Sequence, residues 1–266
     1  MQLPIHIVDA FTDTPFKGNP AAVIISEKWL SDAQMQSIAL ENNLSETAFV
    51  VRSEANRYHI RWFSPLTEVA FCGHASLASA LVLFEQQNHS TETLSFYASA
   101  IGEFSITQRS CGKLQMDFPN TKPEPLSEIP DPLLNGLSYL PDELYRNHQA
   151  LFVVYNSEQK VRTVERNNEL LKTLNPLDVV VTSRSDNSNY DFISRYFWPA
   201  NGGDEDPVTG SIHTGLAPLW AEILGKNRLV GYQASKRGGV VFCEVRGDRV
   251  LVSGNAVRYL RGTIEL

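Results

Sequence analysis

The sequence is poor in cysteine and has no excess of basic residues. Its three cysteines, Cys72, Cys111 and Cys243, are scattered and form no CxxC pair, which argues against a disulfide framework. The 30 acidic residues outnumber the 23 basic ones and give a net charge of −7. This charge argues against binding to nucleic acid or to an anionic membrane surface. A small anionic ligand remains compatible, because local dipoles can hold it.

Long apolar runs are also absent. No stretch approaches the ~18 apolar residues of a membrane span. The first residues, MQLPIHIVDAF, lack the basic and apolar regions of a signal peptide. We therefore expect a cytoplasmic protein with no membrane partner. A length of 266 residues allows one large domain or two modest ones.

Several catalytic and cofactor motifs are missing. The chain has neither the GxGxxG nor the GxxxxGK[ST] pattern that cradles nucleotide phosphates. It has no HExxH, and His74 and His213 lack the spacing of metal ligands. It also has no GxSxG nucleophile elbow. The sequence thus predicts no nucleotide cofactor, no metal and no serine nucleophile.

What the chain does contain is a series of short β-branched and aromatic runs, typical of strands. One helix is predicted over 31–43, because Ser31 precedes Gln34 with capping-box spacing and Met35 and Ile38 share a face. The predicted strands are 5–11, 21–25, 47–51, 58–63, 94–98, 103–106, 114–118, 150–155, 178–182, 190–198, 229–235, 240–245 and 249–254.

One pattern occurs twice. The stretch 61-RWFSP-65 precedes FCGHASLASALVLFE (71–85), and 195-RYFWP-199 precedes TGSIHTGLAPLWAE (209–222). Two chance strand-to-helix junctions are one explanation, since Ala, Gly and Leu are common there. The shared aromatic, proline and glycine positions favour a duplicated lobe with a long helix beginning near Gly73 and another near Gly210.

A proline-rich stretch lies between the copies. PNTKPEPLSEIPDP (119–132) holds five of the chain's fourteen prolines, a density that favours a linker over a sheet strand. The predicted division is an N-terminal lobe over 1–118, a linker over 119–132 and a C-terminal lobe over 133–266.

Each predicted helix start could bind an anion. Free backbone N–H groups and a positive dipole end are expected at Gly73 and Gly210. Two such ends converging across a cleft between the lobes would hold one small carboxylate. Ser211 is a good N-cap and could also contact a ligand, although capping alone is the simpler interpretation. Pro218 should kink the second helix or end it early.

Two carboxylates and a histidine are candidates for proton transfer. Glu46 enters an apolar strand directly after a helix, so it is either exposed or partly desolvated. Desolvation would raise its pKa toward neutrality and suit it to act as a general base. Asp206 precedes Pro207, which keeps it extended, but it could also belong to a solvated acidic loop. His74 could cap a helix or donate a proton.

Four motifs in order carry a family resemblance. The stretches 18-GNPAAV-23, 44-LSETAFV-50, 61-RWFSPLTEVAFCGHASLA-78 and 206-DPVTGSIH-213 together resemble the PhzF-like phenazine-biosynthesis proteins, which share the diaminopimelate epimerase fold. The resemblance implies an α+β fold of two pseudo-symmetric lobes, each a mostly antiparallel β-sheet or barrel around a central α-helix. It also implies that 255–266 returns to complete the first lobe, that the protein is a homodimer and that no cofactor is needed.

The same resemblance assigns roles to residues. It places the catalytic glutamate at Glu46 and supporting proton-transfer groups at His74 and Asp206. Substrate contacts fall on Ser45, Gly73, Gly210, Ser211 and Asn19. The implied activity is a cofactor-independent isomerase that shifts a proton, and with it a double bond, in a small carboxylate.

Two other functions remain open at this point. An amino-acid racemase or epimerase of the related fold would use a thiol from each lobe. Cys72 adjoins the first helix start, but the second block has Asp206 and Thr209 and no cysteine. That alternative predicts loss of activity on replacing Cys72, and the isomerase predicts little loss. A non-catalytic small-molecule-binding protein predicts tight binding without exchange of substrate C–H protons.

Overall fold

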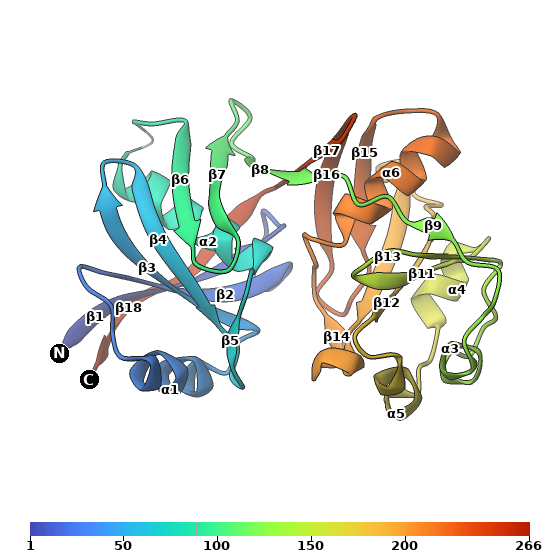
Figure 1. The fold of residues 1–266 in the computed structure, drawn as a ribbon. Helices are drawn as coiled ribbons and strands as arrows, with labels where there is room; N and C mark the ends of the chain where they lie inside the picture. Colours follow the sequence, from blue (N-terminus) through green and yellow to red (C-terminus); the bar gives the residue numbers. More distant parts are fainter. Residues whose placement is uncertain (89) are drawn as a thin grey trace. The chain divides into compact units, whose positions relative to one another are not determined.

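A computed structural model describes residues 1–88 and 90–266 of the chain. The chain forms two compact units (Figure 1). Unit 1 comprises Met1–Asp117 and Ser253–Leu266, and unit 2 comprises Phe118–Val252. Both units combine strands with a few helices, as the predicted α+β class requires. Within the described ranges, no helix has the length and apolar character needed to span a bilayer.

Unit 1 is built from strands around one long helix. Its elements are β1 (Gln2–Ala10), β2 (Asn19–Ser26), α1 (Asp32–Asn42), β3 (Glu46–Glu54), β4 (Arg57–Phe63), β5 (Glu68–Val69), α2 (Gly73–Gln86), β6 (Thr93–Ala98), β7 (Gly102–Gln108), β8 (Leu114–Pro119, which ends in unit 2) and β18 (Ala256–Glu265).

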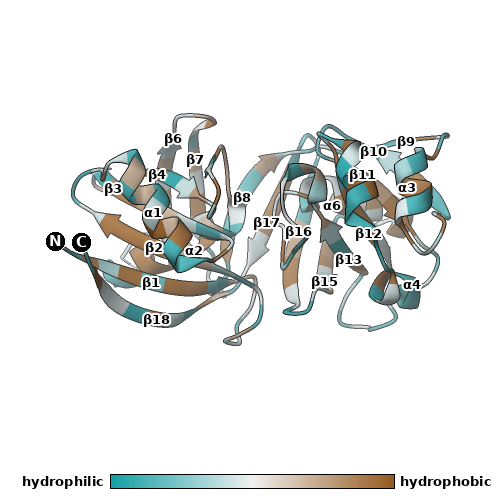
Figure 2. Ribbon diagram, turned by 90° about the horizontal axis from the view of Figure 1, so that it is seen from below, coloured by the Kyte–Doolittle hydropathy of each residue, from teal (hydrophilic) through white to brown (hydrophobic). Residues whose placement is uncertain are grey.

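The long helix α2 is the centre of unit 1. It contacts β1, β2, β3 and β18, and nearly all of its side chains are buried. β1 and β2 carry long hydrophobic stretches in Figure 2, and β3 contributes Ala48, Phe49 and Val50 to the same buried core. β18 pairs antiparallel with β1, so the two ends of the chain lie side by side, and Leu266 N donates to Met1 O over 2.8 Å.

The shorter helix α1 follows its sequence signals. The Ser31 side chain accepts from Gln34 N, and the Gln34 side chain accepts from Ser31 N, which confirms the predicted capping box. Met35 and Ile38 lie on one face, as predicted, and this face is buried. The helix ends at Asn42, and its C-cap Asn43 has a φ of 47°, the left-handed conformation typical of a helix C-terminus. This turn leads directly into β3.

Unit 2 contains a second long helix and several short ones. Its elements are β9 (Glu124–Pro125), α3 (Asp131–Gly136), β10 (Glu143–Arg146), β11 (Ala150–Val154), α4 (Glu158–Thr163), α5 (Asn168–Leu171), η1 (Lys172–Leu174), β12 (Asp178–Arg184), β13 (Phe192–Phe197), η2 (Pro199–Asn201), β14 (Glu205–Asp206), α6 (His213–Leu224), β15 (Arg228–Gln233), β16 (Gly239–Arg246) and β17 (Arg249–Gly254, whose end lies in unit 1).

The two units repeat one topology. In unit 1, β2 pairs in parallel with β3, β3 and β5 pair antiparallel with β4, β6 pairs in parallel with β4, and β7 pairs antiparallel with β6. Unit 2 has the same pairings. There, β11 pairs in parallel with β12, β12 and β14 pair antiparallel with β13, β15 pairs in parallel with β13, and β16 pairs antiparallel with β15. α2 and α6 occupy equivalent places in these series, which supports the inferred duplication.

The repeated arginine–aromatic–phenylalanine pattern has a structural reason. Arg61 in β4 binds both carboxylate oxygens of Glu68 over 2.7 Å. Arg195 in β13 binds both carboxylate oxygens of Glu205 over 2.8 and 2.9 Å. Glu68 lies opposite Phe63, and Glu205 lies opposite Phe197. In each unit the arginine therefore fixes the short strand that leads to the long helix.

The start of α6 differs from the prediction. The helix begins at His213, not near Gly210, and its N-cap is Ile212, not Ser211. Bonds from His213 N to Gly210 O and from Thr214 N to Ser211 O form a tight turn before the helix. The longer connection in this copy leaves room for that turn.

Pro218 does not end α6, which runs on to Leu224. Proline has no N–H for the carbonyl of Thr214, four residues earlier. The N–H of Thr121 donates to this carbonyl instead, over 3.2 Å. A bond from outside the helix therefore satisfies the group that proline leaves unpaired.

Residues 119–132 are part of unit 2, not a separate linker. Glu124 and Pro125 form β9, which pairs with β10, and Leu126 N donates to Leu144 O. Proline lacks a donor but keeps its carbonyl acceptor, so a short edge strand tolerates it. The unit boundaries fall at 117/118 and 252/253 instead of flanking the proline-rich stretch.

Candidate active site

Glu46 is the first residue of β3, at the point where the turn after α1 enters the sheet. Parallel pairing with β2 places Ala21 opposite Glu46. The Glu46 side chain is only 14% exposed, and its Oε2 lies 3.1 Å from Nε2 of His74, which is 7% exposed. His74 is the second residue of α2. The fold thus brings a buried carboxylate to the amino-terminal turn of the central helix of unit 1.

Asn19 and Cys72 also contact the His74 ring, both at Nδ1. Nδ1 of His74 lies 3.2 Å from Nδ2 of Asn19 and 3.4 Å from Sγ of Cys72. Asn19 is fully buried as the first residue of β2, and Cys72 is the N-cap of α2. In the neutral ring, an Asn19 N–H that donates to Nδ1 places the single ring proton on Nε2, facing Glu46. The imidazole is thereby fixed between an amide and a carboxylate.

The pKa of Glu46 differs from the desolvated-base prediction. Burial by itself raises the pKa of this carboxyl, but the charge of His74 and the contacts with His74 and Cys72 together outweigh burial and hold the pKa below its ordinary value. Glu46 is therefore a carboxylate at neutral pH, able to accept a proton. The sequence suggested desolvation, but it did not reveal two polar side chains aimed at the carboxylate.

The other predicted residues of unit 1 are neighbours of this group. Ser45 is the partly buried residue before Glu46. Gly73 is the first residue of α2, as the sequence predicted, and lies between Cys72 and His74. The positive end of α2 is thus on the chain segment that carries the His74 and Cys72 side chains.

Asp206 lies in unit 2 at the end of β14. Its Oδ2 accepts from Thr209 Oγ1 over 2.5 Å. The fully buried Gln233 donates to the Asp206 carbonyl over 2.8 Å and accepts from Thr209 N over 2.9 Å. Asp206 is partly buried and held, not part of a solvated acidic loop.

Ser211 lies in the turn before α6 and has a defined partner. Its Oγ accepts from Nε2 of Gln149 over 3.0 Å. Gln149 also contacts the Tyr196 hydroxyl over 3.1 Å, and that hydroxyl donates to Oδ2 of Asp178 over 2.5 Å. Because Ser211 accepts from Gln149, its own hydroxyl hydrogen can be donated to a ligand. Gly210, its neighbour, accepts from His213 N in the same turn.

Sequence reasoning missed Gln149, Tyr196 and Asp178. Burial raises the pKa of the Asp178 carboxyl, although Tyr196 and Asn201 donate hydrogen bonds to it. The duplication could have revealed Asp178: it begins β12 as Glu46 begins β3. The residue after each acid pairs with the phenylalanine of the repeated motif: Thr47 pairs with Phe63, and Val179 pairs with Phe197. The two acids thus occupy equivalent positions in the two units.

The structure therefore groups the predicted residues within each unit. In unit 1, Glu46, His74 and Asn19 converge, and Cys72 joins them. In unit 2, Asp206 is joined to Thr209 and Gln233, and Ser211 is joined to Gln149.

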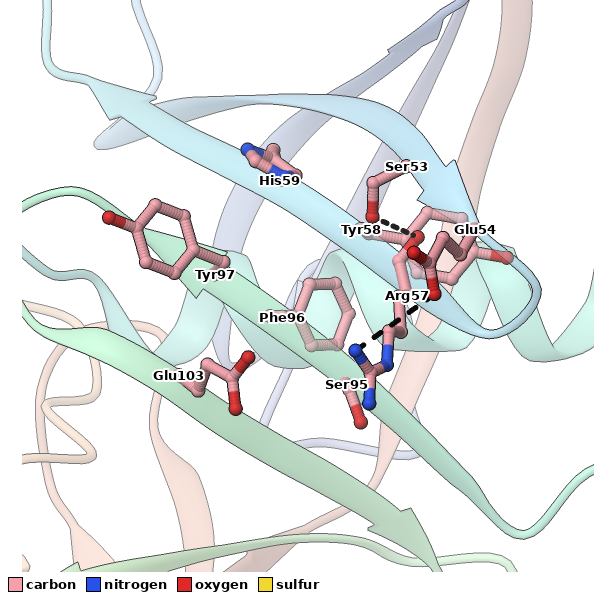
Figure 3. Close-up of a pocket in the computed structure, with 9 residues that line it drawn as sticks. All are labelled: Ser53, Glu54, Arg57, Tyr58, His59, Ser95, Phe96, Tyr97 and Glu103. Carbon is pink, nitrogen blue, oxygen red and sulfur yellow. Dashed lines mark hydrogen bonds and ion pairs between the residues drawn. The ribbon is translucent and has the colours of Figure 1, made fainter.

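A separate surface pocket of about 270 Å³ contains none of these residues. Figure 3 shows it at the β3–β4 hairpin end of unit 1. Arg57 and Glu54 form a long 3.9 Å ion pair there, and both side chains are more than half exposed. Exposed charges in water are weak proton-transfer groups, so the Glu46 group is the better candidate site. The pocket is lined by Ser53, Glu54, Arg57, Tyr58, His59, Ser95, Phe96, Tyr97 and Glu103.

Known proteins resemble the whole chain. The family model PhzC-PhzF, described as phenazine biosynthesis-like protein, matches residues 8–262. An uncharacterized isomerase from Pseudomonas aeruginosa is 47% identical over 266 residues, with 100% of both chains covered. A crystal structure of a PhzF-family phenazine biosynthesis protein from Enterococcus faecalis superposes with a TM-score of 0.94 at 42% identity, covering 100% of each chain.

A more distant similarity concerns the fold alone. A hydroxyproline epimerase from Agrobacterium vitis superposes with a TM-score of 0.56 at 10% identity, covering 99% of this chain and 92% of the other. Together with the PhzF-family structure, it confirms the epimerase-like fold predicted from the sequence.

Proposed function

Because the chain belongs to the phenazine biosynthesis-like PhzF family and is an enzyme of the isomerase class, we propose that it shifts a proton and a double bond within a small carboxylate, with Glu46 as the base. The observation that carries this proposal is the buried Glu46 carboxylate, 3.1 Å from His74 at the first turn of α2.

The proposed reaction conserves atoms and electrons. The Glu46 carboxylate takes a proton from a carbon next to an electron-withdrawing group, and the electron pair of that C–H bond enters the substrate's π system. The protonated Glu46 then returns the proton to another carbon of the same delocalised anion, on the same face. The double bond moves, and no net proton is consumed. A pKa held below the ordinary value keeps Glu46 ready to accept a proton.

His74 and Asn19 have supporting roles in this proposal. His74 holds the carboxylate in place and can stabilise negative charge that develops on the substrate, and Asn19 fixes the His74 ring. Ser45 and the backbone of Gly73 are proposed as substrate contacts beside Glu46.

Three residues of unit 2 are proposed to assist the reaction. We propose Asp206 as a second proton-holding group, fixed by Thr209, and Ser211 as a hydrogen-bond donor to the substrate, with Gly210 as a backbone contact. Family membership further motivates the proposals of a homodimer and of a cytoplasmic location. A sedimentation mass near that of one chain would contradict the dimer.

The proposed chemistry is tested by hydrogen exchange. Small cyclic and acyclic carboxylates are incubated with the protein in heavy water, and deuterium uptake at carbon is followed by NMR. We expect enzyme-dependent uptake together with a shifted double bond for at least one substrate. Tight binding with no exchange in any carboxylate bound would identify a binding protein instead.

A racemase or epimerase is the second candidate function, because Cys72 lies beside His74 and is in contact with Glu46. We expect Cys72→Ser to retain turnover within about tenfold, since the thiol supports Glu46 through one contact, equivalent to ~0.5–1.5 kcal/mol. Loss on the scale of a missing catalytic group (~10²–10⁴-fold), together with inversion at the α-carbon in the wild type, would favour the racemase. Cys111→Ser, at an exposed cysteine, is the matched control.

The role of Ser211 is tested through its partner. Gln149→Met keeps the side-chain length but removes the donor that fixes the Ser211 hydroxyl. Losing one neutral hydrogen bond should raise KM by about 2–10-fold with little change in kcat. Ser211→Ala should act in the same direction. If Ser211→Ala raises KM and Gln149→Met does not, the positioning role of Gln149 is wrong.

A further inference from the structure

Three different donor atoms meet in unit 1. A Glu46 carboxylate oxygen, Sγ of Cys72 and a ring nitrogen of His74 all lie within 4.8 Å of one another. Thiolate, imidazole and carboxylate are the ligands that zinc uses in proteins, whereas magnesium and calcium favour oxygen alone. We propose that Glu46, Cys72 and His74 form a binding site for Zn²⁺ or a similar thiophilic divalent cation, which inhibits the enzyme reversibly.

The distances between the donor atoms suit a tetrahedral ion. Typical zinc bond lengths place a nitrogen and an oxygen ligand roughly 3.3 Å apart, and a sulfur and a nitrogen ligand roughly 3.6 Å apart. Nε2 of His74 lies 3.1 Å from Oε2 of Glu46 and 3.9 Å from Sγ of Cys72. These two separations lie within a few tenths of an ångström of the expected ones, but Sγ of Cys72 is only 3.4 Å from Nδ1. A rotation of the Cys72 side chain is therefore needed to carry the sulfur to the Nε2 side of the ring.

One oxygen of the Glu46 carboxylate could bind a cation in addition to its present contact. Oε2 is buried and lies 3.1 Å from Nε2 of His74, an ion-pair distance at which the geometry of a direct hydrogen bond is poor. A cation bound between this oxygen and Nε2 would neutralise the buried carboxylate more completely than this contact does.

The surroundings of His74 support ligation through Nε2. The Asn19 side chain contacts Nδ1 over 3.2 Å. A carboxamide turned by 180° presents its oxygen in place of its nitrogen, and that oxygen would accept from Nδ1–H. Metal-binding histidines usually make such a hydrogen bond with their other nitrogen, which fixes the ring. Asn19 would have this role here.

Occupancy by zinc would block the proposed reaction. The ion would bind the Glu46 oxygen that accepts the proton and would displace the thiol proton of Cys72 to solvent. Three protein ligands leave a fourth position for water or a substrate carboxylate. This inference shares its residues with the proposed function, but its test measures binding and needs no turnover. The two can therefore fail independently.

The experiment is equilibrium dialysis of the full-length protein against Zn²⁺, with the bound metal measured by mass spectrometry. We expect one Zn²⁺ per chain in the wild type and in Cys111→Ser, whose exposed thiol lies outside the cluster. In Cys72→Ser, Zn²⁺ should bind at least ~10–100-fold more weakly, because a direct ligand is lost. Mg²⁺ in excess should not displace the ion.

A second measurement avoids reliance on variants. Cd²⁺ added to the wild type should produce the ultraviolet absorption of a cadmium–thiolate bond, and Cys72→Ser should lack it while Cys111→Ser keeps it. No zinc bound to the wild type would overturn the proposal. So would zinc that binds Cys72→Ser as tightly as the wild type, or binding that disappears in Cys111→Ser.

Discussion

Glu46→Gln is expected to lower turnover by ~10²–10⁴-fold, the contribution of a positioned general base. Glutamine has nearly the shape of glutamate and keeps a carbonyl acceptor for His74 and Cys72, but it cannot take a proton from carbon. Binding of a carboxylate ligand should not weaken, because the variant adds no bulk and removes a negative charge that would repel the ligand. The measurement is the rate of deuterium uptake by a substrate found in the exchange screen.

The matched control lies at the other end of the same strand. Glu54 ends β3, and its side chain is 71% exposed, so Glu54→Gln should be kinetically silent and change the free energy of unfolding by roughly 0.5 kcal/mol or less. Thermal melting of both variants separates loss of chemistry from loss of fold. Undiminished turnover in Glu46→Gln, with Glu54→Gln also at the wild-type rate, would remove Glu46 from the mechanism.

Local patterns predicted the parts of the fold that depend on neighbouring residues. The capping box at Ser31 and Gln34 and the buried face of Met35 and Ile38 involve residues within one helix, and both are present. The start of α6 was mispredicted because Ser211 has the side chain of a good N-cap. The turn bonds that move the cap to Ile212 become visible only in three dimensions.

The site was predictable to the extent that motifs mark it. Glu46 and His74 came from family-like motifs, and the sheet brings them together across 28 positions of sequence. The pKa direction of Glu46 was not predictable, because it depends on which side chains face the carboxylate after folding. The chain from Asp178 through Tyr196 and Gln149 to Ser211 joins residues from separate elements, and no local pattern marks it.

The same arginine substitution in the two units is expected to have unequal effects on stability. Arg195 is 12% exposed and Glu205 is 16% exposed. The guanidinium of Arg195 also contacts the carbonyls of Val161, Arg162 and Val164 over 3.2–3.4 Å and lies 5.0 Å from the centre of the Phe197 ring. Arg61 is 24% exposed, and its partners Glu68 and Asp32 are 40% and 81% exposed.

Arg195→Met should therefore lower the free energy of unfolding by about 3–5 kcal/mol. Among the described residues, it leaves the mostly buried Glu205 with Arg166, at 3.6 Å, as its only cationic partner. It also removes the hydrogen-bond donor of three backbone carbonyls. Arg61→Met should cost about 1 kcal/mol or less, since water can solvate the acids that it leaves behind. Methionine retains the apolar part of the side chain in both variants, so packing loss is similar. Urea denaturation followed by tryptophan fluorescence measures both free energies. Equal losses in the two variants would contradict the argument, since the two arginines share their sequence motif and differ in burial and in the carbonyls that Arg195 contacts.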